Sequence, residues 1–422
     1  MQAGESPSYR RRRYFGYVLA AGVSVVVFWM IVVPALQAQN FGITFFPDGR
    51  IEIRDFPSIL VFAKAFWKGT ANYDVQSYIS ATSEWAGRPL DIALPFPYSP
   101  TMLWLLGPFC PLPTAWAFTL WTILGLCVVW RLAGPRWPIW VGVAFFSPTA
   151  MLCFSLGQTV LLSTAALLFL SSLYPASGRE PAEGSWRIWV GGVVLWALSA
   201  KPQVAVTAGL ALVGARQWRI LAVALAMTAF STLLLAPRLG VHGFLGYLGM
   251  LAHYDTQTTE FFGRNLFPEK MGNLRALLHI TFGLGDTLAF RCSAALWVCA
   301  LVGLLCADTL RRLDNACRWC LFVLAYLLFC PHLIASEELH LVLILALMSV
   351  WAAGAGAFVP WAAVALGLAV LFLPVLQANA IRIAAVFGAK VGLAGLLSWR
   401  SAVLRPVASA VGGQSSGFSA LS

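Results

Sequence analysis

Residues 10–36 read RRRRYFGYVLAAGVSVVVFWMIVVPAL, four arginines followed by a long apolar run. A helix of this length crosses a hydrocarbon core of about 30 Å. The start is like that of a signal peptide, but the apolar run is too long for one and lacks a small-residue cleavage site. The stretch therefore predicts a retained first span. Because basic flanks stay in the cytoplasm, residues 1–13 are predicted to be a cytoplasmic segment.

The rest of the chain continues in the same way. Of its 422 residues 59% are hydrophobic and 11% are charged, which is typical of a polytopic membrane protein. We therefore expect an all-α fold, with one transmembrane domain over residues 14–400, no separate soluble domain, and about twelve spans of roughly 20 residues each. Besides the first, the predicted spans cover 113–132, 137–155, 158–174, 187–200, 202–216, 219–236, 287–309, 317–331, 339–358, 359–376 and 381–399.

Alternation from a cytoplasmic start places the basic loops on one side of the membrane, as expected for short cytoplasmic loops. The opposite face receives two long loops, at about 37–97 and 237–286, in which we expect amphipathic helices. Residues 401–422 are predicted to be a cytoplasmic tail, disordered in its Gly/Ser-rich part. The cytoplasmic arginines are Arg131, Arg136, Arg179, Arg187, Arg216, Arg219, Arg311, Arg312, Arg318, Arg400 and Arg405.

The formal net charge of +11 does not indicate nucleic-acid binding, because most arginines lie in short loops that set orientation. The nine cysteines are scattered through apolar runs without the paired spacing of a disulfide framework. Cys317 and Cys320 form a C-x-x-C at the start of an apolar run, with no second pair nearby. Helix packing is favoured there over a metal or redox role, and no metal site is predicted.

Asp55 begins an amphipathic segment whose apolar positions, from Phe56 to Trp67, recur at helical spacing. Such a helix would lie at the membrane interface and hold the carboxylate at headgroup depth. Taken alone, Asp55 is better explained as the cap of this helix than as a catalyst, although one carboxylate can do both. Asp74, Glu84 and Asp91 compete for the catalytic role, and each is more easily explained as a solvated loop residue.

Three further polar motifs interrupt apolar surroundings on the same predicted face. Tyr98 lies in a proline-rich corner that ends a helix and could also line a sugar or lipid path. Gln158 follows Gly157, and Gln203 lies two residues after Lys201. A lysine at the membrane boundary either snorkels to water or has a function, and the sequence leaves both open. The glutamines could instead satisfy carbonyl groups freed by Pro202.

The second long loop combines Arg264, Asn273 and Arg275 with histidines and tyrosines, a mixture suited to an anionic, hydroxyl-rich ligand. The histidines are spaced too irregularly to predict a metal site. Later, Glu337, Glu338 and His340 could supply a further acid or base. Adjacent carboxylates point to different sides of a helix, so at most one of them would face a shared cavity.

Taken in order, these motifs resemble glycosyltransferase family 87, the DUF2029 membrane proteins of the GT-C superfamily. The resemblance covers residues 14 to 400. The chain departs from the family's pattern at two places. A glutamate pair and a leucine precede His340, where an aromatic residue is expected, and Gly272 stands where proline is common. The motifs are Asp55-Phe56 with Gly69 and Tyr73, Tyr98-x-Pro100 with Leu112-Pro113 and Trp116, Gly157-Gln158, Lys201-Pro202-Gln203, Met271 to Leu278, and Pro331 to His340.

The resemblance implies a GT-C-like bundle that transfers a sugar, mannose-like or arabinofuranose-like, from a polyprenyl-phosphate donor to a lipid or glycan acceptor. Transfer would proceed with inversion, without a cofactor, at the outer face of the cytoplasmic membrane. The family's catalytic carboxylate falls on Asp55. Arg264, Arg275 or Lys201 would stabilise the leaving phosphate. The predicted substrate-binding residues are Tyr98, Gln158, Lys201, Gln203, Arg264, Asn273, Arg275 and His340.

Two other classes of protein remain as alternatives. Many spans, proline-broken helices and a boundary lysine would suit a secondary transporter. Such a transporter is expected to show a sequence repeat between its two halves, and this sequence shows none. A non-enzymatic envelope protein that handles lipids or glycans is the second alternative. Both would share the membrane lipids as partners, and neither would require the carboxylate at Asp55.

Overall fold

The fold is a helical bundle with one small hairpin. Strand β1 (Ile43–Phe45) pairs antiparallel with β2 (Ile51–Ile53). The all-α prediction is therefore confirmed apart from this hairpin, which lies in the first long loop. The computed structural model describes residues 7–38, 42–45, 51–89, 98–132, 139–173, 185–262, 271–311, 313–332, 335–344, 346–347, 358–372 and 380–412.

Five helical segments in the described part of the chain are long and apolar enough to cross a membrane, or six if α8 and α9 form one bent span. The first is α1 (Pro7–Val27), which continues through the π-helical turn η1 (Phe28–Val32) into α2 (Val33–Gln37). These segments have large apolar side chains exposed on their outer faces, as expected for contact with lipid. The other four are α6 (Thr114–Leu132), α12 (Trp218–Phe262), α14 (Asp286–Arg311) and α18 (Ala380–Gly412).

The predicted span 339–358 lies largely outside the described residues, and the other remaining predicted spans are shorter helices, so the count of about twelve spans is not confirmed. Prolines and glycines divide the apolar runs: the run over 137–155 is two helices, the second of which begins at Pro148, and Gly157 separates that helix from the next. These helices are α7 (Ile139–Ala144), α8 (Pro148–Leu156), α9 (Val160–Ser172), α10 (Ser185–Leu198), α11 (Pro202–Gly214), α15 (Asn315–Phe329) and α17 (Phe358–Phe372).

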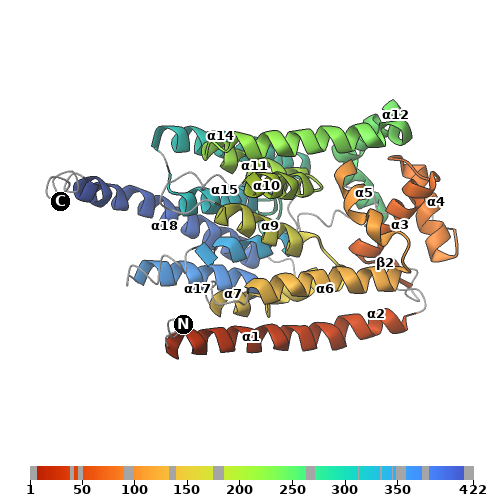
Figure 1. Ribbon diagram of the computed structural model, residues 1–422. Helices are drawn as coiled ribbons and strands as arrows, with labels where there is room; N and C mark the ends of the chain where they lie inside the picture. Colours follow the sequence, from red (N-terminus) through yellow and green to blue (C-terminus); the bar gives the residue numbers. More distant parts are fainter. Residues whose placement is uncertain are drawn as a thin grey trace.

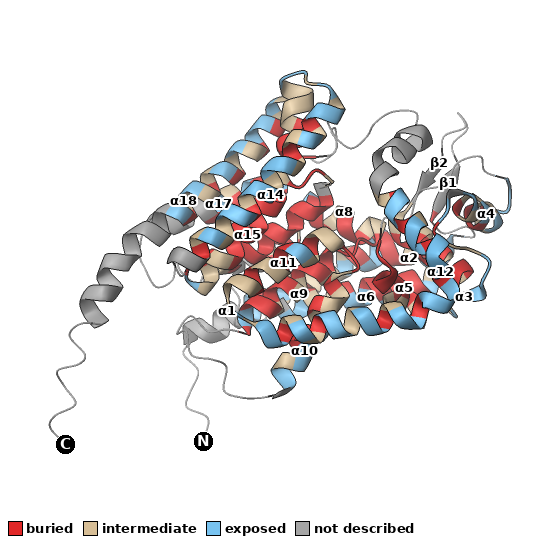
Figure 2. Ribbon diagram, turned by 90° about the horizontal axis from the view of Figure 1, so that it is seen from above, coloured by how far each residue is buried: buried red, intermediate tan, exposed pale blue. Residues whose placement is uncertain are grey.

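The short helices form the centre of the molecule. Figure 2 shows buried residues concentrated in α9, α11 and α15, and in α15 the eight successive side chains of 321–328 are all buried. Cys317 and Cys320 lie on this helix and are fully buried, which supports the packing interpretation of the C-x-x-C. A helix that is apolar all round is stable only inside a protein or a membrane, and here neighbouring helices cover it.

The two ends of the bundle differ in structure. Helix α1 begins and α18 ends at the left of Figure 1, whereas α3 (Asp55–Lys68) and α4 (Val75–Ala86) lie at the right. The predicted helix after Asp55 is confirmed as α3, whose buried residues include Phe56, Leu60 and Phe66. The second long loop begins as helix, because α12 continues past Pro237 and departs from helical geometry only at Gly240, where φ is 58°.

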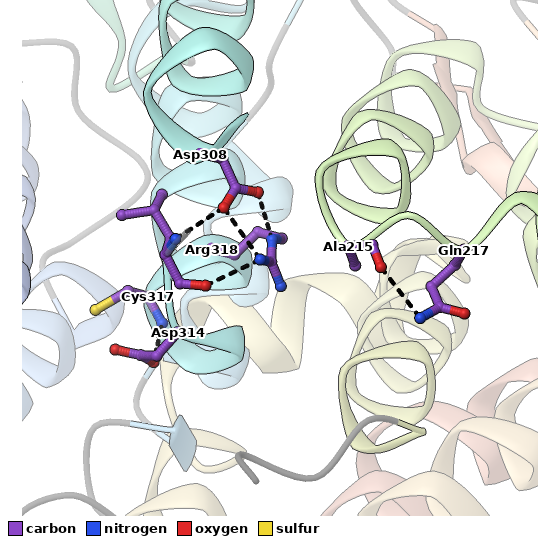
Figure 3. Close-up of polar contacts among 7 residues, drawn as sticks. Ala215, Gln217, Asp308, Asp314, Cys317 and Arg318 are labelled. Carbon is purple, nitrogen blue, oxygen red and sulfur yellow. Dashed lines mark hydrogen bonds and ion pairs between the residues drawn. The ribbon is translucent and has the colours of Figure 1, made fainter. Parts of the chain in front are cut away.

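At the end opposite α3, a buried carboxylate closes the turn between α14 and α15 (Figure 3). Asp308 is 2% exposed and accepts hydrogen bonds from Arg318 Nε at 2.5 Å and from the Leu313 amide at 2.9 Å. Gly214 in α11 packs against this pair, since an added Cβ would lie 2.1 Å from Asp308 Oδ2. Arg318, predicted only as a charge that sets orientation, is thus also the partner of Asp308.

Candidate active site

Asp55 is the first residue of α3, at the end of the bundle that also holds α4. The N-cap position belongs to Arg54, whose side chain makes no capping hydrogen bond, so the interpretation of Asp55 as the cap is wrong. In the first turn its carboxylate is instead favoured by the positive end of the helix dipole. Asp74, expected to be a solvated loop residue, caps α4 by accepting a hydrogen bond from the Ser77 amide at 2.8 Å.

The break between α8 and α9 packs directly against this first turn. Gly157 ends α8 at φ 67°, and the two helices meet at an angle of 114°. A Cβ added to Gly157 would lie 2.5 Å from Phe56 Cβ, and Arg54 Nη1 donates to the Ser155 carbonyl at 3.4 Å. Glycine is thus required both for the left-handed conformation and for the close approach of the two elements.

Gln158 follows this glycine and is 2% exposed. Its amide nitrogen donates to the Cys153 carbonyl at 2.9 Å, which fixes the backbone of the break. Its side-chain oxygen Oε1 is buried and has no hydrogen-bond partner within the described ranges. A buried acceptor of this kind is costly unless water or a ligand satisfies it.

Tyr98 and the turn before α11 form the next side of the site. Ser99 joins the proline-rich corner to this turn, because its amide donates to the Ala200 carbonyl at 3.1 Å and its hydroxyl to the Ser199 carbonyl at 2.6 Å. Lys201 is 8% exposed, and its Nζ lies 5.8 Å from the centre of the Tyr98 ring. The ring face and the ammonium group are therefore close enough for a cation–π interaction.

Lys201 is paired with a carboxylate instead of reaching to water. Its Nζ donates to Glu337 Oε1 at 2.9 Å, and the Glu337 side chain is only 3% exposed. Burial has the largest single effect and lowers the pKa of Lys201, but the charges of Glu337, Tyr98 and Asp55, together with the hydrogen bond to Glu337, raise the net pKa above its usual value. Lys201 therefore stays an ammonium ion, and snorkelling does not explain its position.

Asp55 acts electrostatically on the same two groups. Burial raises the pKa of Tyr98, the charge of Lys201 opposes this shift, and the charge of Asp55 adds to it. The pKa of Lys201 is in turn raised in part by Asp55. Asp55, Tyr98 and Lys201 thus share one electrostatic environment, although they come from three segments far apart in the sequence.

The late motif forms the 3₁₀ helix η5 (Ala335–His340), whose residues from Ser336 onward are all buried. Cys153 Sγ contacts the Ser336 carbonyl at 3.3 Å, which places η5 against α8. His340 Nδ1 lies 2.8 Å from the Glu337 carbonyl and its Nε2 lies 2.9 Å from Ser163 Oγ. Because a carbonyl only accepts, Nδ1 is the donor, and His340 holds η5 against α9.

The adjacent carboxylates of η5 point to different sides, as predicted. Glu337 faces Lys201, and Glu338 pairs with Lys390 on α18, whose Nζ lies 2.5 Å from Glu338 Oε1. Lys390 is fully buried, and the sequence analysis did not single it out. The available signal was a lone lysine inside the apolar run 381–399, which marks a candidate functional residue in a membrane segment.

Asn273 and Arg275 make structural contacts next to η5. Asn273 caps the short helix α13 (Leu274–Ala276) and donates to the Cys330 carbonyl at 2.6 Å. Arg275 is fully buried and donates to both carboxylate oxygens of Asp286, at 2.9 and 2.6 Å, and to the Pro331 carbonyl at 3.1 Å. These contacts give both residues a structural role that ties the second long loop to the chain before η5.

The structure thus brings most of the predicted site residues together, but not all of them. Gln203 lies half-buried in the first turn of α11, next to Lys201. Arg264 and Asp91 lie outside the described residues. No group of three or more His, Cys, Asp or Glu side chains that could hold a metal ion occurs in the described part of the chain. Among the predicted residues, Lys201 and His340 contact Glu337 and Tyr98 lies beside Lys201. Asp55 and Gln158 lie where the start of α3 meets the break after α8.

Comparison with known proteins adds an independent finding. The family model of glycosyltransferase family 87 matches residues 96–336, which is more than half of the chain. The match includes Tyr98, Gln158 and Lys201, begins after Asp55 and ends before His340. Comparison with curated proteins and with solved structures gave no match. The chain therefore belongs to glycosyltransferase family 87.

Proposed function

We propose that this glycosyltransferase moves a sugar from a polyprenyl-phosphate donor to a lipid or glycan acceptor, with inversion, at the outer face of the cytoplasmic membrane. The observation that carries the proposal is the buried Lys201–Glu337 pair beside Tyr98, in a bundle where the break after α8 packs against the first turn of α3, which Asp55 begins. A carboxylate and a cation are the two charges that such a transfer needs, one at the acceptor and one at the leaving phosphate.

In the proposed reaction, Asp55 accepts the proton of the acceptor hydroxyl as its oxygen attacks the anomeric carbon of the donor sugar. The bond between that carbon and the phosphate oxygen breaks, and polyprenyl phosphate leaves with the bonding electron pair. The acceptor oxygen enters from the face opposite the phosphate, so the configuration at the anomeric carbon inverts. Lys201 offsets the negative charge that develops on the leaving phosphate.

Helix termini support the same placement of the phosphate. The N-cap residues of α3, α9 and α11 are Arg54, Thr159 and Lys201. None of them makes a side-chain capping hydrogen bond. The amide groups at a helix N-terminus favour an anion. Their proximity follows from the packing of Gly157 against Phe56 and from the shared environment of Asp55 and Lys201.

Membership of a glycosyltransferase family weighs against the two alternatives, a secondary transporter and a non-enzymatic envelope protein. The proposal assigns donor binding to Tyr98, Gln158 and Lys201, with Gln203 beside them and His340 holding η5 in place. It assigns no phosphate contact to Arg275, whose donors face Asp286 and Pro331.

The role of Asp55 can be tested with the full chain in nanodiscs, using radiolabelled polyprenyl-phosphate mannose and polyprenyl-phosphate arabinofuranose. We expect Asp55→Asn to lower turnover by about 10²-fold or more, because general-base catalysis contributes that much. Glu84→Gln is the matched control, since Glu84 is an exposed carboxylate on α4. Equal turnover by Asp55→Asn and the parent would remove Asp55 from the mechanism.

A further inference from the structure

Lys390 lies in the middle of α18, inside a segment that is apolar enough to cross a membrane, and it is fully buried. Placing an ammonium group there is costly unless its charge and all its donors are satisfied. An ammonium group has three donors. The Nζ of Lys390 has three acceptors: Gly272 O at 2.8 Å, Leu327 O at 3.1 Å and Glu338 Oε1 at 2.5 Å.

The three acceptors belong to segments that are distant in the sequence and that border the candidate site. Gly272 directly precedes Asn273, the cap of α13, and Leu327 lies in the last turn of α15. Glu338 is the neighbour of Glu337, the partner of Lys201. One cation therefore joins the second long loop, the end of α15 and η5 at a single point.

The packing at this point leaves little room for adjustment. A Cβ added to Gly272 would lie 2.6 Å from Val386 Cγ1 and 3.0 Å from Glu338 Oε1. The loop backbone therefore runs directly between α18 and the carboxylate. Glu338 is 5% exposed, and its second oxygen, Oε2, has no hydrogen-bond partner among the described residues. Loss of Lys390 would leave this carboxylate buried without its ammonium partner.

We propose that Lys390 is a positioning residue for the transferase site: it fixes Glu338, and through the backbone of η5 it holds Glu337 against Lys201. The expected effect of Lys390 on turnover rests on the proposed function. Its expected effect on the position of η5 rests on the contacts alone. Lys390 does not touch the substrate. It restrains the position of the Glu337 carboxylate, and hence the place of the Lys201 ammonium beside Tyr98.

The structure supplies a probe of η5 that does not depend on activity. Cys153 is fully buried and its Sγ contacts the Ser336 carbonyl at 3.3 Å. If η5 moves, this thiol loses its cover and becomes accessible to N-ethylmaleimide. The labelling rate at Cys153, followed by peptide mass spectrometry on the full chain in nanodiscs, therefore reports the position of η5 directly.

The test compares Lys390→Met with Arg318→Met. The control removes the cation of another buried ion pair, Asp308–Arg318, at the end of the bundle opposite α3. We expect Lys390→Met to raise the labelling rate of Cys153 by about tenfold or more. Its kcat should fall by a similar factor with the donor KM within about twofold of the parent, and Arg318→Met should change none of these quantities in the folded fraction. A tenfold factor corresponds to about 1.4 kcal/mol.

The double variant Lys390→Met/Glu338→Gln keeps the proposal testable if the single variant does not fold, because it leaves no uncompensated charge. We expect its Cys153 labelling rate and kcat to lie between those of the single variant and the parent. Parental labelling in either Lys390 variant would overturn the proposal, as would an equal rise in the Arg318→Met control. If the parent turns over neither donor, the proposed function fails, and the labelling experiment still decides the role of Lys390.

Discussion

At the scale of single residues, the charged groups of the site are defined by their partners. Lys201 is held by Glu337 and lies over the Tyr98 ring, and its position differs from that of an interfacial lysine that reaches to water. Asp55 lies in the first turn of α3 without capping it. Tertiary contacts therefore place both residues, as the proposed mechanism requires.

We expect Lys201→Met to lower kcat by at least about tenfold, because the leaving phosphate loses its nearest buried cation. The double variant Lys201→Met/Glu337→Gln should remain equally slow, which separates the loss of the cation from the stranding of Glu337. Lys64→Met is the control, since Lys64 is a lysine of α3 whose Nζ donates to the Leu112 carbonyl. Recovery of parental turnover in the double variant would show that Lys201 serves only to neutralise Glu337.

The conformation of Gly157 gives a second prediction at this scale. Gly157→Ala should destabilise the protein by about 1–3 kcal/mol or more, since it combines a φ of 67° with a Cβ that would lie 2.5 Å from Phe56 Cβ. Gly69→Ala is the matched control, because Gly69 has a φ of 83° and nothing within 4 Å of an added Cβ. Thermal unfolding in detergent should show the larger loss for Gly157→Ala, and equal losses would exclude the contact with α3 as a cause.

At the scale of elements, the site is assembled from helix ends and short helices. The break between α8 and α9 contacts α3, the start of α11 contacts η5, and η5 is held against α9 by His340. Helix ends carry unsatisfied amide groups, so their convergence creates a polar environment inside an apolar bundle. The short helices α10, α11 and α15 make this possible, because their ends lie within the fold.

Arg275→Met tests whether the motif at 271–278 is structural. Breaking a fully buried ion pair lowers the free energy of unfolding by about 3–5 kcal/mol. We expect a smaller loss for Arg275–Asp286, because the Asp286 side chain is 25% exposed. Folded protein should keep the donor KM of the parent. A large rise in donor KM without loss of thermal stability would restore Arg275 as a ligand of the phosphate.

At the scale of the whole molecule, the bundle separates two ends. The start of α1 and the end of α18 lie far from α3 and α4, and the proposed site lies with α3 (Figure 1). Exposed apolar side chains cover the outer helices between these ends, as in Leu225, Leu233 and Val298. This arrangement would let a polyprenyl chain lie along the bundle with its phosphate at the α3 end.

The proposed orientation can be measured by labelling intact cells with a membrane-impermeant maleimide. Gln76→Cys, at an exposed position of α4, should be labelled from outside, whereas Glu180→Cys should be labelled only after the cells are opened. The parent with its nine native cysteines provides the background rate. Labelling of both positions from the same side would overturn the orientation.

The sequence by itself determined that the chain is a helical membrane protein and where most of the described helices lie, and it singled out the polar motifs proposed for the site. These features depend on local composition. The length of an apolar run decides whether a helix can span a membrane, and proline and glycine end helices at or near their own positions. The sequence overestimated the number of long spans, since a buried short helix such as α15 is as apolar as a lipid-facing one.

Only the tertiary structure decided which charges pair. Lys201 and Glu337 are 136 residues apart, and Lys390 and Glu338 are 52 residues apart. No periodicity within a helix relates such positions, because the pairs form only when separate helices pack. The same packing gave Arg275 a carboxylate partner and required glycine at 157 and 272, where another element approaches the backbone.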